Sequence, residues 1–136
     1  MGVRELLLYS KSLNVLYVED EEISQALYAS IFEDIFSTID IANDGIEAME
    51  FYTSKHYDLV ISDVCMPRMD GLELSKTILD KNPEQLIIIM SAYNEKEQLD
   101  EIASIGISEI LLKPVQNGDL MNTLEKVAKN AFNAKN

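Results

Sequence analysis

Four short apolar segments of the chain are each followed by one or two side chains that could take part in chemistry. These side chains are three carboxylates, a hydroxyl and an amine: Glu19, Asp20, Asp63, Ser91 and Lys113. Three carboxylates in one place raise one another's pKa unless a cation joins them. Mg²⁺ prefers oxygen ligands and is usually held by one or two carboxylates together with a phosphate. The residues therefore predict a site for Mg²⁺, or Mn²⁺, and a phosphoryl group.

The same residues suggest how such a site could react. Asp63 could act as the nucleophile and form an aspartyl phosphate. The Lys113 amine would place a positive charge on one phosphoryl oxygen, and the Ser91 hydroxyl would donate a hydrogen bond to another. Charge that develops during transfer would then be met by metal, ammonium and hydroxyl together.

These side chains meet only if the fold brings the segment ends together. Strand-like segments alternate with longer stretches whose apolar spacing is near 3.6 residues, a pattern of βα units. The expected strands are residues 14–18, 37–41, 59–63, 86–90 and 110–112. The pattern predicts an α/β fold with a five-stranded parallel sheet and five flanking helices. For this three-layer, doubly wound sheet we take a flavodoxin-like strand order, 2-1-3-4-5, which the pattern itself does not fix. In this order the first and third strands are neighbours, and their carboxyl ends form the ligand site.

Length, composition and charge restrict the function further. A chain of 136 residues is expected to form one domain with a real core. The net charge of −13 argues against direct contact with nucleic acid or with anionic membranes. Neither a signal peptide nor a membrane-length apolar stretch is visible, and the single cysteine, Cys65, suits a reducing cytoplasm. We expect a main domain over residues 13–130, an N-terminal extension or short helix over 1–12, and a polar tail over 131–136.

Four motifs in this order resemble the receiver domain of two-component response regulators. They are residues 15–21, 63–71, 90–92 and 112–114, and the resemblance covers nearly the whole chain. It implies that Asp63 accepts a phosphoryl group from a sensor histidine kinase or a histidine phosphotransfer protein. It also implies that Glu19, Asp20, Asp63 and the backbone carbonyl of Cys65 hold Mg²⁺, and that the Lys113–Pro114 bond is cis, which X-Pro bonds tolerate. Phosphorylation would then switch contacts in a homodimer or with a downstream effector.

One position departs from the family pattern. Receivers commonly carry an aromatic residue three positions before the lysine, where this chain has Ile110. Because an aliphatic side chain has no ring to swing inward, switching is expected to depend on Ser91 and the loop that follows it. We also expect Tyr93 to cover part of the site and to slow the attack of water on the acyl phosphate.

Other interpretations of these residues remain. Asp20 or Ser91 could simply cap a helix, and Lys113 could be a surface lysine. His56, the single histidine, is expected to be a solvated loop residue, and nearby carboxylates disfavour a reactive Cys65 thiolate.

Of two alternative functions, one remains. A phosphatase of the haloacid dehalogenase type needs a second acid two residues after its nucleophile, where this chain has Cys65, so no separate turnover enzyme is expected. The second alternative is a receiver-like interaction module that acts without obligatory phosphorylation.

Overall fold

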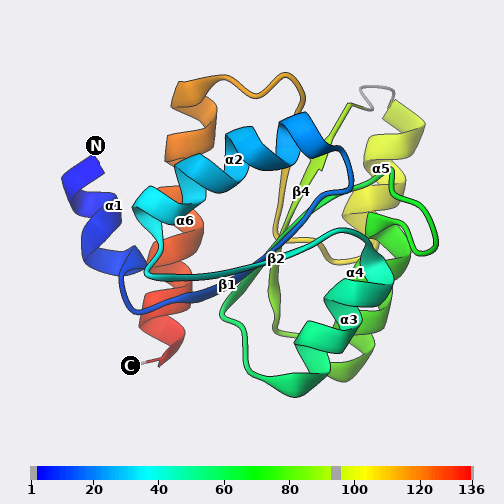
Figure 1. Ribbon diagram of the computed structural model, residues 1–136, viewed down its shortest axis with the longest axis horizontal. Helices are drawn as coiled ribbons and strands as arrows, with labels where there is room; N and C mark the ends of the chain where they lie inside the picture. The colour runs from blue at the N-terminus through cyan, green and yellow to red at the C-terminus, as the bar shows by residue number, and fades with distance from the viewer. Residues whose placement is uncertain (1–2, 93–95, 136) are drawn as a thin grey trace.

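A five-stranded parallel sheet with helices on both faces forms the protein, in a computed structural model that describes residues 3–92 and 96–135. The sheet order is β2-β1-β3-β4-β5, which confirms the predicted order (Figure 1). The strands are β1 (Asn14–Val18), β2 (Thr38–Ala42), β3 (Leu59–Asp63), β4 (Leu86–Ser91) and β5 (Glu109–Leu112). The helices are α1 (Val3–Ser10), α2 (Glu22–Ile35), α3 (Gly45–Ser54), α4 (Gly71–Lys81), α5 (Lys96–Ser104) and α6 (Asn117–Lys135). Five helices follow the five strands as expected, and α1 is a sixth.

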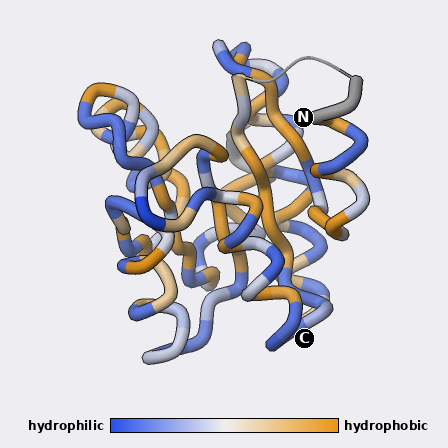
Figure 2. The backbone as a smooth tube through the Cα atoms, turned by 90° about the vertical axis from the view of Figure 1, so that its right-hand side faces the viewer, coloured by the Kyte–Doolittle hydropathy of each residue, from blue (hydrophilic) through white to orange (hydrophobic). Residues whose placement is uncertain are grey.

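The three central strands are the most apolar segments of the chain. Residues 15–18 of β1, 59–62 of β3 and 87–91 of β4 are buried, as expected for parallel strands covered on both faces. In Figure 2 these strands form hydrophobic traces through the middle of the molecule, whereas the helices alternate between hydrophobic and hydrophilic residues. The β-branched residues from which strands were predicted therefore lie in the sheet. In a strand that helices cover on both sides, the side chains that point to either face are buried.

The helices form two outer layers, one on each face of the sheet. Helices α1, α2 and α6 cover one face, and α3, α4 and α5 cover the other (Figure 1). Because strand side chains alternate between faces, Tyr17 and Ile61 belong to the core under α2 and α6, whereas Leu16 and Val60 belong to the core under α3, α4 and α5. The same alternation determines toward which face of the sheet the side chain of each functional residue at a strand end points.

Two Asp-Gly pairs begin helices α3 and α4. Asp44 and Asp70 cap α3 and α4, and each side chain accepts a hydrogen bond of 2.8 Å from a backbone N–H three residues on. Gly71 lies against the backbone of Asp63, where a Cβ atom would clash with the Asp63 carbonyl oxygen. Gly71 N–H also donates to the Val64 carbonyl at 2.8 Å. The start of α4 is thus held directly against the end of β3.

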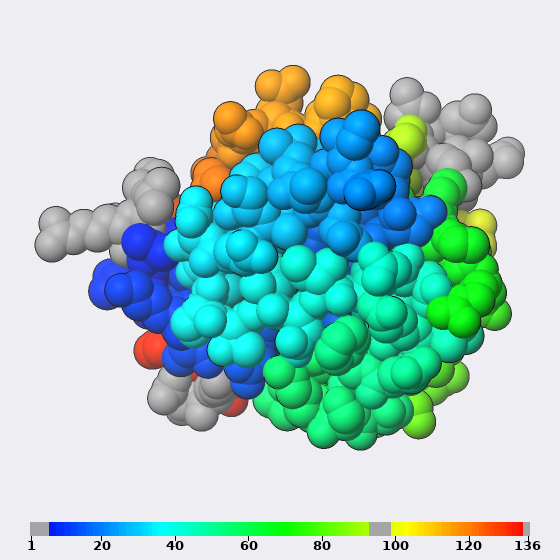
Figure 3. All heavy atoms as spheres, in the orientation of Figure 1, coloured from blue at the N-terminus to red at the C-terminus, as the bar shows by residue number. Residues whose placement is uncertain are grey.

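The N-terminal helix packs against the C-terminal one. Leu6 is buried, the rings of Tyr9 and Phe132 meet edge to face at 5.6 Å, and Ser10 Oγ donates to the Ile35 carbonyl at 2.7 Å. The space-filling view shows α1 at the edge of the molecule beside atoms of α6 (Figure 3). Here the structure differs from the expected polar tail: α6 continues to Lys135 and Ala131 is buried. No helix within the described ranges is long and apolar enough to cross a membrane.

Candidate functional site

Three carboxylates meet where β1 and β3 end. The two strands are hydrogen-bonded neighbours, with Val18 opposite Ser62, so the residues after each strand lie side by side. One carboxylate oxygen each from Glu19, Asp20 and Asp63 lies within 4.8 Å of the others. Glu19 is fully buried, Asp63 is half-buried and Asp20 is exposed. Clustered carboxylate oxygens that remain open to solvent on one side fit a hard divalent cation such as Mg²⁺, which keeps several waters.

Lys113 brings the positive charge of the site. Its Nζ atom lies 2.9 Å from Glu19 Oε1 and 3.3 Å from Asp63 Oδ1. Burial acts to lower the pKa of Lys113, but the hydrogen bond that it donates to Glu19 and the charge of Asp63 outweigh this effect, so this pKa is raised. The Lys113–Pro114 bond is cis, as predicted. Lys113 is therefore a charged amine held between two carboxylates.

Glu19 is the buried member of the acidic cluster. Burial raises its pKa, while the hydrogen bond from Lys113 opposes that rise. Its Oε2 atom accepts from the Glu21 backbone N–H at 3.2 Å, and Gln25 Nε2 donates to its backbone carbonyl at 2.7 Å. The sequence interpretation missed Gln25. Its signal was weak: a polar residue one turn into a helix that begins beside the acids.

Ser91 ends β4 beside the phosphoacceptor candidate. Asp63 is the register partner of Met90, so Ser91 lies one residue farther along the neighbouring strand. Ser91 is buried, and its backbone carbonyl accepts from the Lys113 N–H at 2.7 Å, which ties the end of β4 to the lysine. Since β4 and β5 are parallel neighbours with Ser91 opposite Leu112, Ser91 and Lys113 lie at the same edge of the sheet.

The loop from β3 to α4 lines the open side of the site. Cys65 is exposed and, with Asp20 and Asp70, borders a hollow of about 430 Å³. Arg68 adopts the left-handed backbone region, with φ of 67°, and both its Nε and Nη2 atoms donate to Asp44 Oδ2, at 2.8 and 2.5 Å. This tie between the loop and the start of α3 was not predicted, because nothing in the sequence indicates that Asp44 and Arg68 meet.

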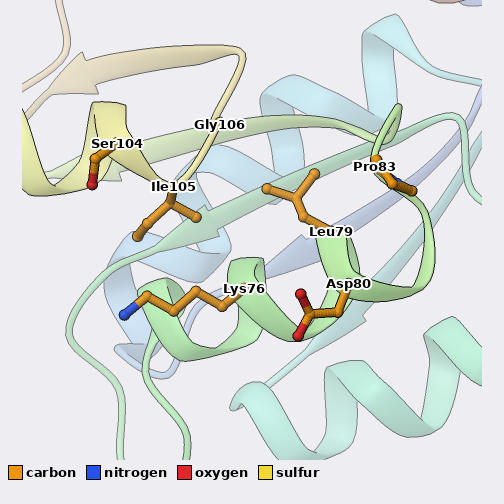
Figure 4. A pocket seen from close by; sticks show the side chains of 7 residues that line it. All are labelled: Lys76, Leu79, Asp80, Pro83, Ser104, Ile105 and Gly106. Carbon is orange, nitrogen blue, oxygen red and sulfur yellow. The ribbon is translucent and has the colours of Figure 1, made fainter.

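A second hollow of similar size lies elsewhere. It has a volume of about 440 Å³ and opens between the C-terminal half of α4 and the turn after α5 (Figure 4). Lys76, Asp80 and Gly106 are among its lining residues, and none of the predicted site residues contributes to it. It is therefore separate from the acidic cluster.

Of the other residues that the sequence singled out, Ile110 and His56 do not join the cluster. Ile110 is half-buried in β5, where it packs against the core under α3, α4 and α5 and borders a hollow with Leu112 and Val115. Tyr93 lies outside the described residues. His56 has an exposed side chain that lies 3.2 Å from Asp58 Oδ1, just before β3 and thus at the opposite end of that strand from Asp63.

Comparison with known proteins identifies the family. Residues 15–125 match the model of the response regulator receiver domain. The chain is 31% identical over 118 residues to the chemotaxis protein CheY of Listeria monocytogenes, covering 86% of this chain and 99% of that protein. It is 33% identical over 103 residues to the Regulator of RpoS of Escherichia coli, covering 76% of this chain but spanning only 31% of that protein.

The fold is also shared with solved structures. The N-terminal domain of an uncharacterized protein from Wolinella succinogenes matches with a TM-score of 0.81 and 29% identity, over 91% of this chain and 99% of that one. Four features thus agree: the family match, the strand order, the acidic cluster at the ends of β1 and β3, and the lysine at the end of β5. The chain belongs to the response regulator receiver domain family.

Proposed function

We propose that this receiver domain of a two-component system accepts a phosphoryl group on Asp63 in a reaction that needs Mg²⁺ or Mn²⁺. The observation that carries the proposal is the contact of Lys113 Nζ with both Glu19 and Asp63 inside a cluster of three carboxylates. Three mutually repelling acids are costly to keep together. Binding of a cation and a phosphoryl group would explain why these three acids lie together.

The transfer is a substitution at phosphorus. A carboxylate oxygen of Asp63 forms the new O–P bond, and the P–N bond of a phosphohistidine breaks, with its electron pair returning to the imidazole nitrogen. A bound Mg²⁺ would neutralise charge on the phosphoryl oxygens, held by Glu19, Asp20, Asp63 and the Cys65 carbonyl. Lys113 and the Ser91 hydroxyl supply positive charge and a hydrogen bond to the same oxygens.

The proposed donor is a phosphohistidine on a sensor histidine kinase or a histidine phosphotransfer protein in the cytoplasm. The carboxylate of Asp63 is half-buried at the end of β3, beside a hollow that opens to solvent, so a partner side chain can approach it. Phosphorylation would change contacts in a homodimer or with a downstream effector by biasing two conformations a few kcal/mol apart. With Ile110 in place of an aromatic residue, we propose that Ser91 and the following loop, including Tyr93, transmit the change.

Intact-mass analysis tests the proposal. The protein is incubated with acetyl phosphate, with and without Mg²⁺, beside an Asp63→Asn variant. We expect the wild type to gain one phosphoryl group only when Mg²⁺ is present, and the variant to gain none. A folded protein that binds Mg²⁺ but gains no phosphoryl group would favour an interaction module that acts without phosphorylation.

A further inference from the structure

The hydroxyl of Tyr17 is buried beneath the site without a hydrogen-bond partner. It is the one such side-chain polar atom in the part of the chain that the structure describes. Burying a hydroxyl without a hydrogen bond costs free energy, and buried polar groups in native proteins are nearly always paired. A Phe would fill the same space without this cost. The presence of the hydroxyl is therefore best explained by a hydrogen bond that forms in another state of the protein.

The position of Tyr17 connects it to the acidic cluster. It lies two residues before Glu19 on β1, and its register partner Ile61 lies two residues before Asp63 on β3. Because side chains two residues apart point to the same face of a strand, Tyr17 forms the layer directly beneath these two acids. Its ring is held edge to face against Phe32 at 5.0 Å. The ring is thus held in the core layer beneath the acidic cluster.

The electrostatic surroundings agree with this placement. Burial is the main cause that raises the pKa of Tyr17, and the charges of Glu19 and Asp63 raise it further. The phenol therefore stays protonated, as a neutral donor that faces the field of two carboxylates. What it lacks in this state is an acceptor within hydrogen-bonding distance.

Such an acceptor arises when Lys113 changes partner. In the structure Lys113 Nζ and the Glu21 N–H donate to the two oxygens of Glu19. When Asp63 carries a phosphoryl group, the ammonium is drawn to the phosphoryl oxygens, which carry more negative charge than one carboxylate. Glu19 would keep its contact with the bound cation, but its side chain is fully buried, so the hydrogen bond that Lys113 gave it could be replaced only by another protein donor.

We infer that Tyr17 is a positioning residue whose hydroxyl donates to the Glu19 carboxylate when Lys113 turns to the phosphoryl group. The inference rests on the proposed function and gives a role to a residue that was not among the predicted site residues. Its consequence is specific to one state. The hydroxyl lowers the stability of the unphosphorylated protein and raises that of the phosphorylated protein.

The test compares Tyr17→Phe with wild type in both states. Beryllofluoride with Mg²⁺ serves as the phosphoryl mimic, and its apparent Kd is measured from the shift in unfolding midpoint. We expect Tyr17→Phe without ligands to be as stable as wild type or more stable, and to bind beryllofluoride about tenfold more weakly, the effect of one hydrogen bond to a charged group.

Tyr57→Phe is the matched control. The Tyr57 hydroxyl donates to Asp40 Oδ2 at 2.6 Å, and the residue lies before β3, away from the site. Its loss should lower stability without ligands and leave the beryllofluoride affinity unchanged. Equal affinity in wild type and Tyr17→Phe would overturn the inference while leaving the proposed function in place. A wild type that neither binds beryllofluoride nor gains a phosphoryl group would overturn both.

Discussion

Removing the amine of Lys113 should destabilise the protein through Glu19. Two opposite charges 2.9 Å apart attract by about 6 kcal/mol at an effective dielectric constant of about 20. Desolvation cancels much of this attraction, but loss of one partner leaves the other charge buried, which typically costs about 3–5 kcal/mol. In Lys113→Met the Glu19 carboxylate would be left fully buried beside Asp63 without its cation.

Protonation of Glu19 limits this loss and makes it depend on pH. From an unfolded pKa of about 4.3, protonating a glutamate costs about 4 kcal/mol at pH 7.5 and about 1 kcal/mol at pH 5. Burial already raises the pKa of Glu19, and loss of Lys113 raises it further. A raised folded pKa adds stability below the unfolded pKa that is lost as pH rises through the folded pKa. We therefore expect Lys113→Met to lose about 2–4 kcal/mol at pH 7.5 and about 1 kcal/mol at pH 5.

Urea denaturation with a chelator that removes divalent cations measures the loss. The decisive comparison is the double variant Glu19→Gln/Lys113→Met, in which no buried carboxylate remains at position 19. It should recover most of the stability at pH 7.5. A loss in Lys113→Met that does not change between pH 5 and pH 7.5, or a double variant no more stable than the single one, would refute the reasoning.

Three other predictions concern the frame of the site, an ion pair outside it and the metal. Gly71→Ala should lose about 3 kcal/mol, because its Cβ atom meets the Asp63 backbone, whereas Gly118→Ala, with open space around it, should not be destabilised in urea denaturation. Burial acts to raise the pKa of Asp40, but hydrogen bonds from Lys55 and Tyr57 lower it overall. The advantage of wild type over Asp40→Asn, about 1–2 kcal/mol at pH 6, should therefore begin to fall as pH drops below about 3.9 and vanish only below the lowered pKa of the folded state; a constant difference would contradict this. Millimolar Mg²⁺ should raise the unfolding midpoint of wild type, and Asp20→Asn, an exposed substitution, should reduce that rise without lowering the midpoint in chelator; an equal rise would remove Asp20 from the metal site.

The sheet and the order of the site residues could be predicted because strong local patterns encode them. Strands buried on both faces need continuous apolar segments, and the residues after Val18 and Leu112 leave the core at the same edge of the sheet. The predicted bounds of β2 were one residue too early: residues 37–41 were expected, and the strand is Thr38–Ala42. Four of its five residues are only half-buried, so its apolar pattern is weaker.

Features that depend on long-range contacts could not be predicted. The end of α6 looked like a polar tail because its apolar residues are only Ala131, Phe132 and Ala134. The ring contact of Phe132 is with Tyr9, more than 120 positions away. Likewise, Arg68 and Asp44 are 24 residues apart and meet only because α3 and the loop after β3 are neighbours. The unpaired hydroxyl of Tyr17 becomes visible only when the packing around it is known.

Locating the phosphoryl group is the most direct test of the central claim. The protein is incubated with acetyl phosphate and Mg²⁺, the acyl phosphate is reduced with borohydride, which converts a phosphorylated aspartate to homoserine, and the modified position is found by peptide mass spectrometry. The account predicts homoserine at position 63 and unmodified carboxylates at positions 19 and 20. Modification at another carboxylate, with Asp63 intact, would contradict it.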